Sequence, residues 1–382
     1  MITSPLGFRA AGVAAGIKES GSPDVAVVVN DGPSSAAAGV FTSNRVKAAP
    51  VLWSQQVLAG GSVRAVVLNS GGANACTGPA GFQDTHRTAE HLAAVLGIGA
   101  GEVAVCSTGL IGERLPLAKL LAGLTAATDQ ASADGGLAAA DAIRTTDTVP
   151  KTTHQVGSGY QIGGMGKGAA MLAPALATML VVLTTDADLA PADLTAALRQ
   201  AVGSTFDRLD TDGCMSTNDT VLLLASGATG TRPDLGEFTG LLTAACADLA
   251  TQMQADAEGA SKAITIDVVG AATEPDAVEV GRAIARCNLL KCAIHGQDPN
   301  WGRVLAAVGT TSAAFEPDEL SVAINGVWVC KSGAPGEDRS AVDLGPREVT
   351  ITVDLSAGPH TATIKTTDLT AEYVHENAAY ST

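Results

Sequence analysis

Hydrophobic runs that end in polar turns recur along the chain and predict buried β-strands. They lie at 24–30 ("DVAVVVN"), 64–69, 102–108 ("EVAVCST"), 177–186, 220–227 and 263–270. Val, Ile and Thr are frequent in these runs, and these residue types favour pleated surfaces. Apolar runs without alternation are typical of strands that are covered on both faces.

Helical spacing of apolar residues separates these runs. It predicts helices over 84–97, 115–145, 191–202, 236–258 and 275–292, and Pro116 and Pro191 suit first turns. The region 320–365 is expected to hold alternating strands with turns, and 367–380 a capped helix. No repeat of 20–50 residues and no low-complexity linker divides the chain, so the mixture indicates layered α and β elements of the α+β class.

Composition and charge narrow the classes of function. The 382 residues are 46% hydrophobic and only 3% aromatic, which predicts a large core of Ala, Val and Leu. The net charge of −16 disfavours nucleic acid and anionic membranes as partners. The longest apolar run, 171–183, contains Pro174 and is too short to span a bilayer. Seven scattered cysteines indicate reduced thiols and a cytoplasmic location.

Several segments resemble known motifs only in part. The glycine-rich stretch 68–78 follows a strand but lacks the endings of phosphate and dinucleotide loops, so a tight turn near a pocket is expected. The acidic stretch 206–219 places Arg208 where a calcium loop needs its first ligand, so we expect an acidic turn satisfied by its own backbone. The histidine and cysteine spacings indicate no metal site. Cys106 lies inside an apolar run, where a structural thiol is the ordinary interpretation and a nucleophile the alternative.

Thr178 lies within the apolar run 171–183, where its hydroxyl must either find a hydrogen-bond partner or serve a function. One interpretation is a strand residue whose hydroxyl bonds to the backbone. The other is a nucleophile that becomes a chain N-terminus when the bond after Ala177 is cut, because its own α-amine then serves as the base. Spacing alone leaves both interpretations open.

Ordered sequence blocks identify a family resemblance. "KGAAMLAPALATMLVVLTTDA", "LNSGGANACTG", "CSTGLIGERLP", "RTTDTVPK", "STNDTVLLL", "QADAEGASK", "GQDPNWGRVLAAVG" and "YVHENAAYST" resemble the blocks of ornithine acetyltransferases, the glutamate N-acetyltransferases of arginine biosynthesis. The resemblance covers essentially the whole chain. It implies an α-β-β-α layered sandwich with a smaller C-terminal α/β portion.

The resemblance assigns roles to individual residues. It implies self-cleavage between Ala177 and Thr178, giving an N-terminal chain 1–177 and a C-terminal chain 178–382 that interleave in one fold. Thr178 would be the nucleophile, and Thr108 and Gly109 would form the oxyanion hole. The implied substrate-binding residues are Thr145, Lys167, Thr178, Glu258, Asn377 and Thr382. Taken singly, Lys167 would be an ordinary turn residue, Glu258 a solvated helix residue and Thr382 a frayed end.

The implied reaction is a ping-pong transfer of acetyl from N-acetylornithine to glutamate without metal or organic cofactor. Some family members also use acetyl-CoA, and the sequence leaves that activity open here. The resemblance also implies a heterotetramer of two of each chain. The alternatives are an N-terminal-nucleophile amidohydrolase or aminopeptidase, in which water would take the acyl group, and a non-catalytic amino-acid-binding protein that stays uncut.

Overall fold

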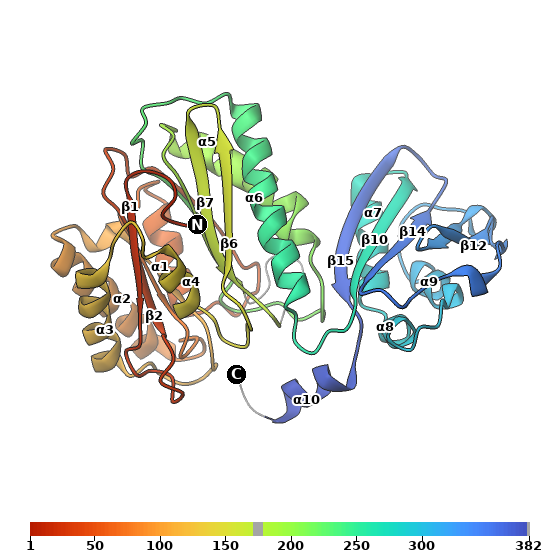
Figure 1. Ribbon diagram of the computed structural model, residues 1–382, viewed down its shortest axis with the longest axis horizontal. Coiled ribbons are helices and arrows are strands. Elements are labelled where there is room, and N and C mark those ends of the chain that lie inside the picture. Colours follow the sequence, from red (N-terminus) through yellow and green to blue (C-terminus); the bar gives the residue numbers. More distant parts are fainter. Residues whose placement is uncertain (171–178, 380–382) are drawn as a thin grey trace. The chain divides into compact units, whose positions relative to one another are not determined.

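The computed structural model describes residues 1–170 and 179–379, which form two compact units. The first unit comprises Met1–Asp207 and Cys214–Asp256. The second comprises Arg208–Gly213 and, of the residues described, 257–379. The ribbon in Figure 1 shows helices and strands in both units, which confirms the α+β class.

A four-stranded sheet in the first unit has the order β1-β2-β4-β5. Its strands are β1 (Phe8–Val13), β2 (Val25–Asn30), β4 (Ala65–Asn69) and β5 (Val103–Ser107). β4 and β5 are parallel and the other neighbours are antiparallel. Every residue of β2, β4 and β5 is buried, which explains why these strands appear in the sequence as uninterrupted apolar runs.

A five-stranded sheet in the same unit has the order β3-β9-β8-β7-β6. Its strands are β3 (Ala37–Phe41), β6 (Lys151–Gly157), β7 (Tyr160–Lys167), β8 (Leu180–Thr185) and β9 (Thr220–Ala225). β8 and β9 are parallel, and the remaining pairs are antiparallel. In this register Lys167, the last residue of β7, lies opposite Leu180, the first residue of β8.

Helices cover the outer faces of the two sheets. α2 (Gly78–Leu96) and α3 (Leu117–Gln130) contact the four-stranded sheet, and α5 (Pro191–Ser204) and α6 (Leu235–Ala255) contact the five-stranded sheet (Figure 1). The inner faces share one core, with Val27 and Leu68 from one sheet and Val182 and Leu222 from the other. α1 (Ala49–Leu58) and α4 (Gly136–Ala142) each contact both sheets. The expected α-β-β-α layering is therefore confirmed.

The second unit is the smaller C-terminal α/β portion. Its six-stranded sheet has the order β13-β12-β11-β14-β10-β15. The strands are β10 (Ala263–Ala271), β11 (Ser321–Ile324), β12 (Val327–Lys331), β13 (Ala334–Pro335), β14 (Glu348–Asp354) and β15 (His360–Thr367). The helices are α7 (Glu274–Ala285), α8 (Asn288–His295), α9 (Trp301–Val308) and α10 (Ala371–Ala379).

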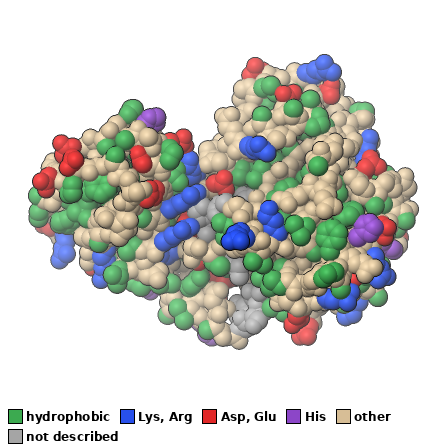
Figure 2. Space-filling model, turned by 180° about the vertical axis from the view of Figure 1, so that it is seen from behind, with side chains coloured by type: hydrophobic (Ala, Val, Ile, Leu, Met, Phe, Trp, Pro, Cys, Tyr) green, Lys and Arg blue, Asp and Glu red, His purple; other side chains and the backbone are tan. Residues whose placement is uncertain are grey.

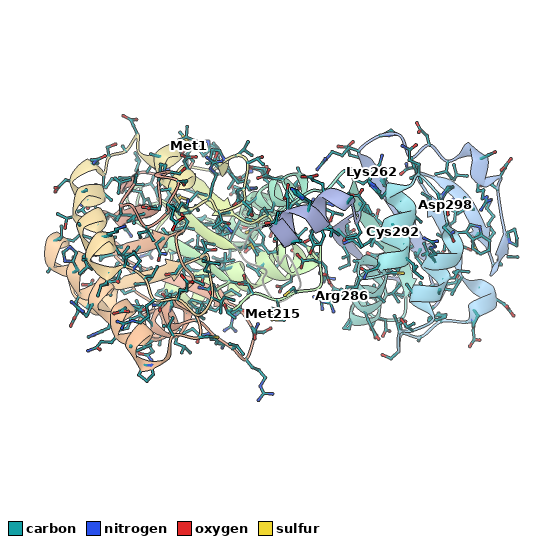
Figure 3. The ribbon with its side chains drawn as sticks, turned by 90° about the horizontal axis from the view of Figure 1, so that it is seen from below. Met1, Met215, Lys262, Arg286, Cys292 and Asp298 are labelled. Atoms are coloured by element: carbon teal, nitrogen blue, oxygen red, sulfur yellow. The ribbon has the colours of Figure 1, made fainter. Side chains whose placement is uncertain are left out.

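Two side chains labelled in Figure 3 tie this unit together. Lys262 donates to the carbonyl oxygens of residues 344–346 and so anchors their loop at the start of β10. Arg286, at the end of α7, pairs with the buried carboxylate of Asp210 at 2.7 Å. Asp210 also accepts the peptide N–H of Gly213, as expected for an acidic turn satisfied by its own backbone.

Two long helices predicted from periodicity are each divided in the structure. The segment predicted over 115–145 forms α3 and α4, because the intervening Ser132 pairs with Ala10 of β1 through two backbone hydrogen bonds. The segment predicted over 275–292 forms α7 and α8, which separate at the extended residue Cys287. The first break depends on a distant part of the chain, which local periodicity does not report.

Other boundaries also differ from the prediction. The helix predicted from 84 begins at Gly78, with a proline in its first turn, and β8 begins at Leu180. The elements that the apolar pattern did not indicate are β1, β3, β6, β7, α1 and α9. Among the residues described, no helix combines the length and apolar character needed to cross a lipid bilayer. On the face shown in Figure 2, acidic and basic side chains are interspersed among uncharged ones.

Candidate active site

Thr108 and Gly109 follow β5 directly, and Thr108 is buried while Gly109 is partly exposed. The Thr108 side chain is 1% exposed, and its Oγ1 has no hydrogen-bond partner among the described residues. Gly109 has a φ of +129°, which side-chain-bearing residues rarely adopt. A buried hydroxyl without a partner costs desolvation free energy, so its presence here suits a group that donates to a ligand.

The loop after β4 supports the loop after β5. The peptide N–H of Gly72 donates to the Thr108 carbonyl at 3.0 Å, and Ala73 N–H donates to Leu110 at 3.0 Å. A Cβ on Gly109 would lie 2.7 Å from the Gly72 nitrogen, so the two backbones meet at a distance that only glycine allows. Two amides of the glycine-rich stretch, those of Gly72 and Ala73, are thus bonded to protein carbonyls, as expected for a structural turn.

Asn69, at the end of β4, fixes both loops. Its Nδ2 donates to the Gly72 carbonyl at 3.0 Å, and its Oδ1 accepts from Ser107 Oγ at 2.6 Å. Its backbone carbonyl accepts the Thr108 N–H at 3.0 Å. These bonds hold the peptide that carries the predicted oxyanion donors in one orientation.

Thr145 and Lys167 meet at one buried carboxylate. Asp147 Oδ2 accepts the Thr145 peptide N–H at 3.2 Å and lies 3.7 Å from Lys167 Nζ. Asp147 Oδ1 accepts from Lys151 Nζ at 2.6 Å and from the Gly168 N–H at 2.7 Å. Lys167 is a buried strand residue, 2% exposed, and the alternative of an ordinary turn residue is wrong.

Opposite charges are balanced inside this cluster. Lys151 is fully buried and also pairs with Asp256 at 2.5 Å, so two ammonium groups face two carboxylates. Burial by itself raises the pKa of Asp147, but Lys167 and Lys151 outweigh it and hold this pKa below its usual range. The ionised Asp147 carboxylate therefore lies beside Lys167 and orients it at the end of β7.

The expected cleavage junction lies in the sequence between β7, which ends at Lys167, and β8, which begins at Leu180. Ala177 and Thr178 themselves lie outside the described residues. Met179, the next residue, donates its N–H to Asp219 Oδ1 at 3.0 Å and accepts at its carbonyl from Thr220 N–H at 3.0 Å. The chain immediately after the junction is thus fixed against the start of β9.

Glu258 and Asn377 lie in the second unit and contact each other. Asn377 Nδ2, on α10, donates to Glu258 Oε2 at 2.9 Å. Glu258 is only 7% exposed, so the alternative of a solvated helix residue is wrong. Thr382 lies outside the described residues. Two of the predicted substrate-binding residues, 119 positions apart, are therefore brought together.

The remaining sequence candidates carry no catalytic geometry. Cys106 is buried in β5, and burial raises the pKa of its thiol to about 12, which suppresses the thiolate at neutral pH. Within residues 1–170 and 179–379, no group of three or more His, Cys, Asp or Glu side chains is arranged to hold a metal ion.

Three residues of this site were missed by sequence reasoning. Asn69, Asp147 and Asp219 all lie in the sequence blocks listed above, but no local pattern distinguishes them from turn residues. The available signal was a polar residue at the end or start of a buried strand, where a side chain can reach neighbouring strand ends. Their roles appear only once the strand order is known.

Comparison with known proteins decides the family. The model of the ArgJ family matches residues 9–382. The chain belongs to the ArgJ family. The matched residues include the sequence blocks that resemble ornithine acetyltransferases and the residues of the site described above.

Curated relatives cover the full length of this ArgJ chain. The "Arginine biosynthesis bifunctional protein ArgJ" of Thermobifida fusca is 71% identical over 381 residues, covering 100% of both chains. The protein of the same name from Streptomyces coelicolor is 68% identical over 380 residues, covering 100% of this chain and 99% of the relative. An ornithine acetyltransferase structure from Mycobacterium tuberculosis, complexed with ornithine, is 60% identical with a TM-score of 0.45, covering 47% of this chain and 95% of that chain.

Proposed function

We propose that this chain is a glutamate N-acetyltransferase of arginine biosynthesis that moves the acetyl group of N-acetylornithine to glutamate through an acetyl-threonine at Thr178. The full-length identity to bifunctional ArgJ proteins carries this proposal. The Thr108 hydroxyl beside Gly109 has no hydrogen-bond partner in the described part of the chain, and this supports the proposal, since acyl transfer needs donors for a developing oxyanion.

The proposed chemistry begins with self-cleavage between Ala177 and Thr178. The freed α-amine, with an ordinary pKa of about 7.7–8.0, takes the proton of the Thr178 hydroxyl as the oxygen attacks the acetyl carbonyl. The tetrahedral oxyanion is stabilised by Thr108 Oγ1 and the Gly109 N–H. Its collapse breaks the C–N bond, and the departing ornithine amine receives the proton. The glutamate amine then attacks the acetyl ester and restores the threonine hydroxyl.

Each unit holds charged residues that suit amino-acid substrates. Lys167 provides an ammonium group for a substrate carboxylate, and Asp147 and Lys151 orient it. Glu258 provides a carboxylate for an amino group, with Asn377 beside it. Thr145 is held by Asp147, and we assign it and Thr382 to substrate binding by family resemblance. The ornithine bound to the Mycobacterium tuberculosis relative belongs to the same substrate class.

The two proposed chains, 1–177 and 178–382, would stay associated after cleavage. β7 precedes the junction and β8 follows it, and the two strands pair over Ile162–Lys167 and Leu180–Thr185. This pairing supports interleaved chains and a cut that leaves the sheet intact. A heterotetramer of two of each chain and a cytoplasmic location stay predictions.

The relatives are named bifunctional. We assign the second activity to acetylation of glutamate with acetyl-CoA as donor, because the same acetyl-threonine can be formed from a thioester. It requires no cofactor beyond that donor.

Mass spectrometry with N-terminal sequencing tests the proposal on the wild type, Thr178→Ala and the control Thr185→Ala. Thr185 is a buried threonine at the other end of β8. We expect two chains in the wild type and the control, the second beginning TMLVVLTTDA, and one chain in Thr178→Ala. Transfer of labelled acetyl from N-acetylornithine to glutamate is expected only from cleaved protein. Release of labelled acetate instead would identify an amidohydrolase, and an active, uncut wild type would refute the threonine mechanism.

A further inference from the structure

Asp368, between β15 and α10, accepts hydrogen bonds from a loop that is distant in the chain. Its Oδ1 accepts the peptide N–H groups of Ser261 and Lys262, both at 2.9 Å, and its Oδ2 accepts from the Ser261 hydroxyl. His295 Nδ1, at the end of α8, lies 3.0 Å from the same Oδ2. The Asp368 side chain is fully buried, so these protein groups take the place of solvent around the carboxylate.

The middle of the same two segments meets at Gly259. Thr370 Oγ1 donates to the Gly259 carbonyl at 2.6 Å, and the same oxygen accepts the Tyr373 N–H at 2.9 Å. Gly259 has a φ of +59°, and an added Cβ would collide with the backbone nitrogen of Tyr373. The loop before β10 and the start of α10 thus approach each other as closely as only a glycine permits.

Asn377, on α10, makes the last contact in this series. Its Nδ2 donates to Glu258 Oε2 and to the Tyr373 carbonyl, each at 2.9 Å. As the chain runs forward from Asp368 to Asn377, its partners run backward from Lys262 to Glu258. The position of the Glu258 carboxylate therefore depends on a series of contacts whose buried end is Asp368.

The side chains around Asp368 do not have the geometry of a nucleophile triad. In such a triad the serine faces one ring nitrogen of the histidine and the acid faces the other. Here His295 Nδ1 lies 3.2 Å from Ser261 Oγ and 3.0 Å from Asp368 Oδ2, and the serine also donates to the acid directly. The arrangement therefore suits a clamp between two segments and not a base that activates the serine.

We infer that Asp368 and Ser261 are positioning residues that hold the Glu258 carboxylate in place to bind the terminal ammonium group of N-acetylornithine. This inference rests on the proposed function. The α-amine of N-acetylornithine carries the acetyl group, so the terminal amine is the cation left to pair with a carboxylate. A hydrogen bond between the two weakens steeply when distance or angle departs from the optimum, so a shift of the Glu258 loop should reduce affinity.

Two substitutions in this cluster have matched controls in the same unit. Ser261→Ala removes one hydroxyl from Asp368. Its control is Ser312→Ala, because Ser312 likewise donates its N–H and its hydroxyl to one carboxylate, that of Glu279. Asp368→Asn removes the carboxylate itself. Its control is Asp210→Asn, because Asp210 is also a fully buried carboxylate and lies outside both segments.

The measurements are kcat and KM for N-acetylornithine, the inhibition constant of N-acetylnorvaline, and the midpoint of thermal unfolding. N-acetylnorvaline has the same carbon chain without the terminal amine, so it gains nothing from the Glu258 carboxylate. We expect Ser261→Ala and Asp368→Asn to raise KM about tenfold, while kcat and the inhibition constant stay near their wild-type values. The two controls should keep the wild-type KM even where their unfolding midpoints fall.

Asp368→Asn decides the matter if it folds, and Ser261→Ala decides it otherwise. A wild-type KM in the deciding variant overturns the inference. An equal rise in the inhibition constant of N-acetylnorvaline, or in the KM of the matched control, also overturns it, because a general loss of structure would have that effect. A wild type that transfers no acetyl from N-acetylornithine would instead refute the proposed function, so the two failures are distinguishable.

Discussion

The peptide N–H of Gly72 donates a 3.0 Å hydrogen bond to the carbonyl oxygen of Thr108, joining two loops that are 36 residues apart in the chain. This bond holds the peptide between Thr108 and Gly109, while the Thr108 hydroxyl has no hydrogen-bond partner among the residues that the structure describes. The predicted oxyanion hole can therefore be tested by substitutions that are expected to lower the catalytic rate without lowering the stability of the fold.

Thr108→Val should reduce catalysis without reducing stability. Valine keeps the shape of threonine, and the lost hydroxyl has no partner among residues 1–170 and 179–379. Losing one oxyanion donor costs about 2.7–4 kcal/mol of transition-state stabilisation, so kcat should fall about 100–1,000-fold. The control Thr88→Val removes a hydroxyl that donates to the Asp84 carbonyl at 2.8 Å and should lower the unfolding midpoint only. Wild-type kcat in Thr108→Val would exclude this hydroxyl as a donor.

Gly109→Ala should disrupt the site more than a matched glycine substitution. Both Gly109 and Gly112 have positive φ, but an added Cβ meets the Gly72 backbone at Gly109 and open space at Gly112. Either alanine is strained by about 1–2 kcal/mol. Only Gly109→Ala must also displace the oxyanion loop, so acetyl transfer should be lost in this variant and retained in Gly112→Ala. Equal activities measured for the two variants would contradict this placement.

Asp147→Asn should destabilise the first unit in a pH-dependent way. Removing one partner of a buried ion pair costs about 3–5 kcal/mol because an uncompensated charge stays buried. The folded pKa of Asp147 is lowered, whereas an unfolded aspartate has a pKa of about 3.9. The stabilisation is therefore fully present above about pH 4 and is lost as the pH falls toward the lowered folded pKa.

Urea unfolding of the wild type and Asp147→Asn at several pH values measures this difference. The free energies of unfolding should differ most near pH 7 and converge below about pH 4, where the unfolded carboxyl is protonated. The exposed pair Arg232–Asp188 provides the control, since Asp188→Asn should change the free energy of unfolding by only about 0–1 kcal/mol. A difference in the free energy of unfolding that grows as the pH falls would contradict the lowered folded pKa of Asp147.

Asn377→Ala should weaken substrate binding more than it affects folding. The side chain is held by Glu258 at 2.9 Å near the end of the described chain, where few other contacts depend on it. We expect KM for N-acetylornithine to rise about tenfold, the equivalent of about 1.4 kcal/mol, with an unchanged unfolding midpoint. Glu372→Ala, an exposed change on the same helix, serves as the control and should leave KM unchanged. An unchanged KM in Asn377→Ala would remove Asn377 from the substrate site.

Cys106→Ala should retain acetyl transfer. The thiol is buried, and its raised pKa of about 12 keeps it protonated at neutral pH. Iodoacetamide should label the exposed Cys76, Cys214 and Cys292 before Cys106 in the folded protein, as peptide mass mapping would show. Loss of acetyl transfer in a folded Cys106→Ala variant would restore Cys106 as the alternative nucleophile.

The sequence alone determined the buried strands, most helices and the family. Runs such as 24–30 and 220–227 are apolar at consecutive positions, and such runs are stable only between two covering layers. These local patterns indicated layered α and β elements, whereas the α-β-β-α arrangement and the family rested on the resemblance of the ordered sequence blocks. The assignment of Thr178, however, rested on the resemblance, because one threonine in an apolar run has no distinguishing periodicity.

Tertiary structure decided which polar residues meet. Asp147 joins Thr145 to Lys167, and Asn218 reaches Ser107 across 111 positions. These contacts depend on strand order and register, which bring loops together whatever their separation in the chain. A hydrophobic pattern reports that a face is buried, but it does not report which distant backbone that face will meet. The division of the helix predicted over 115–145 has the same origin, since Ser132 exchanges its helical hydrogen bonds for bonds to Ala10.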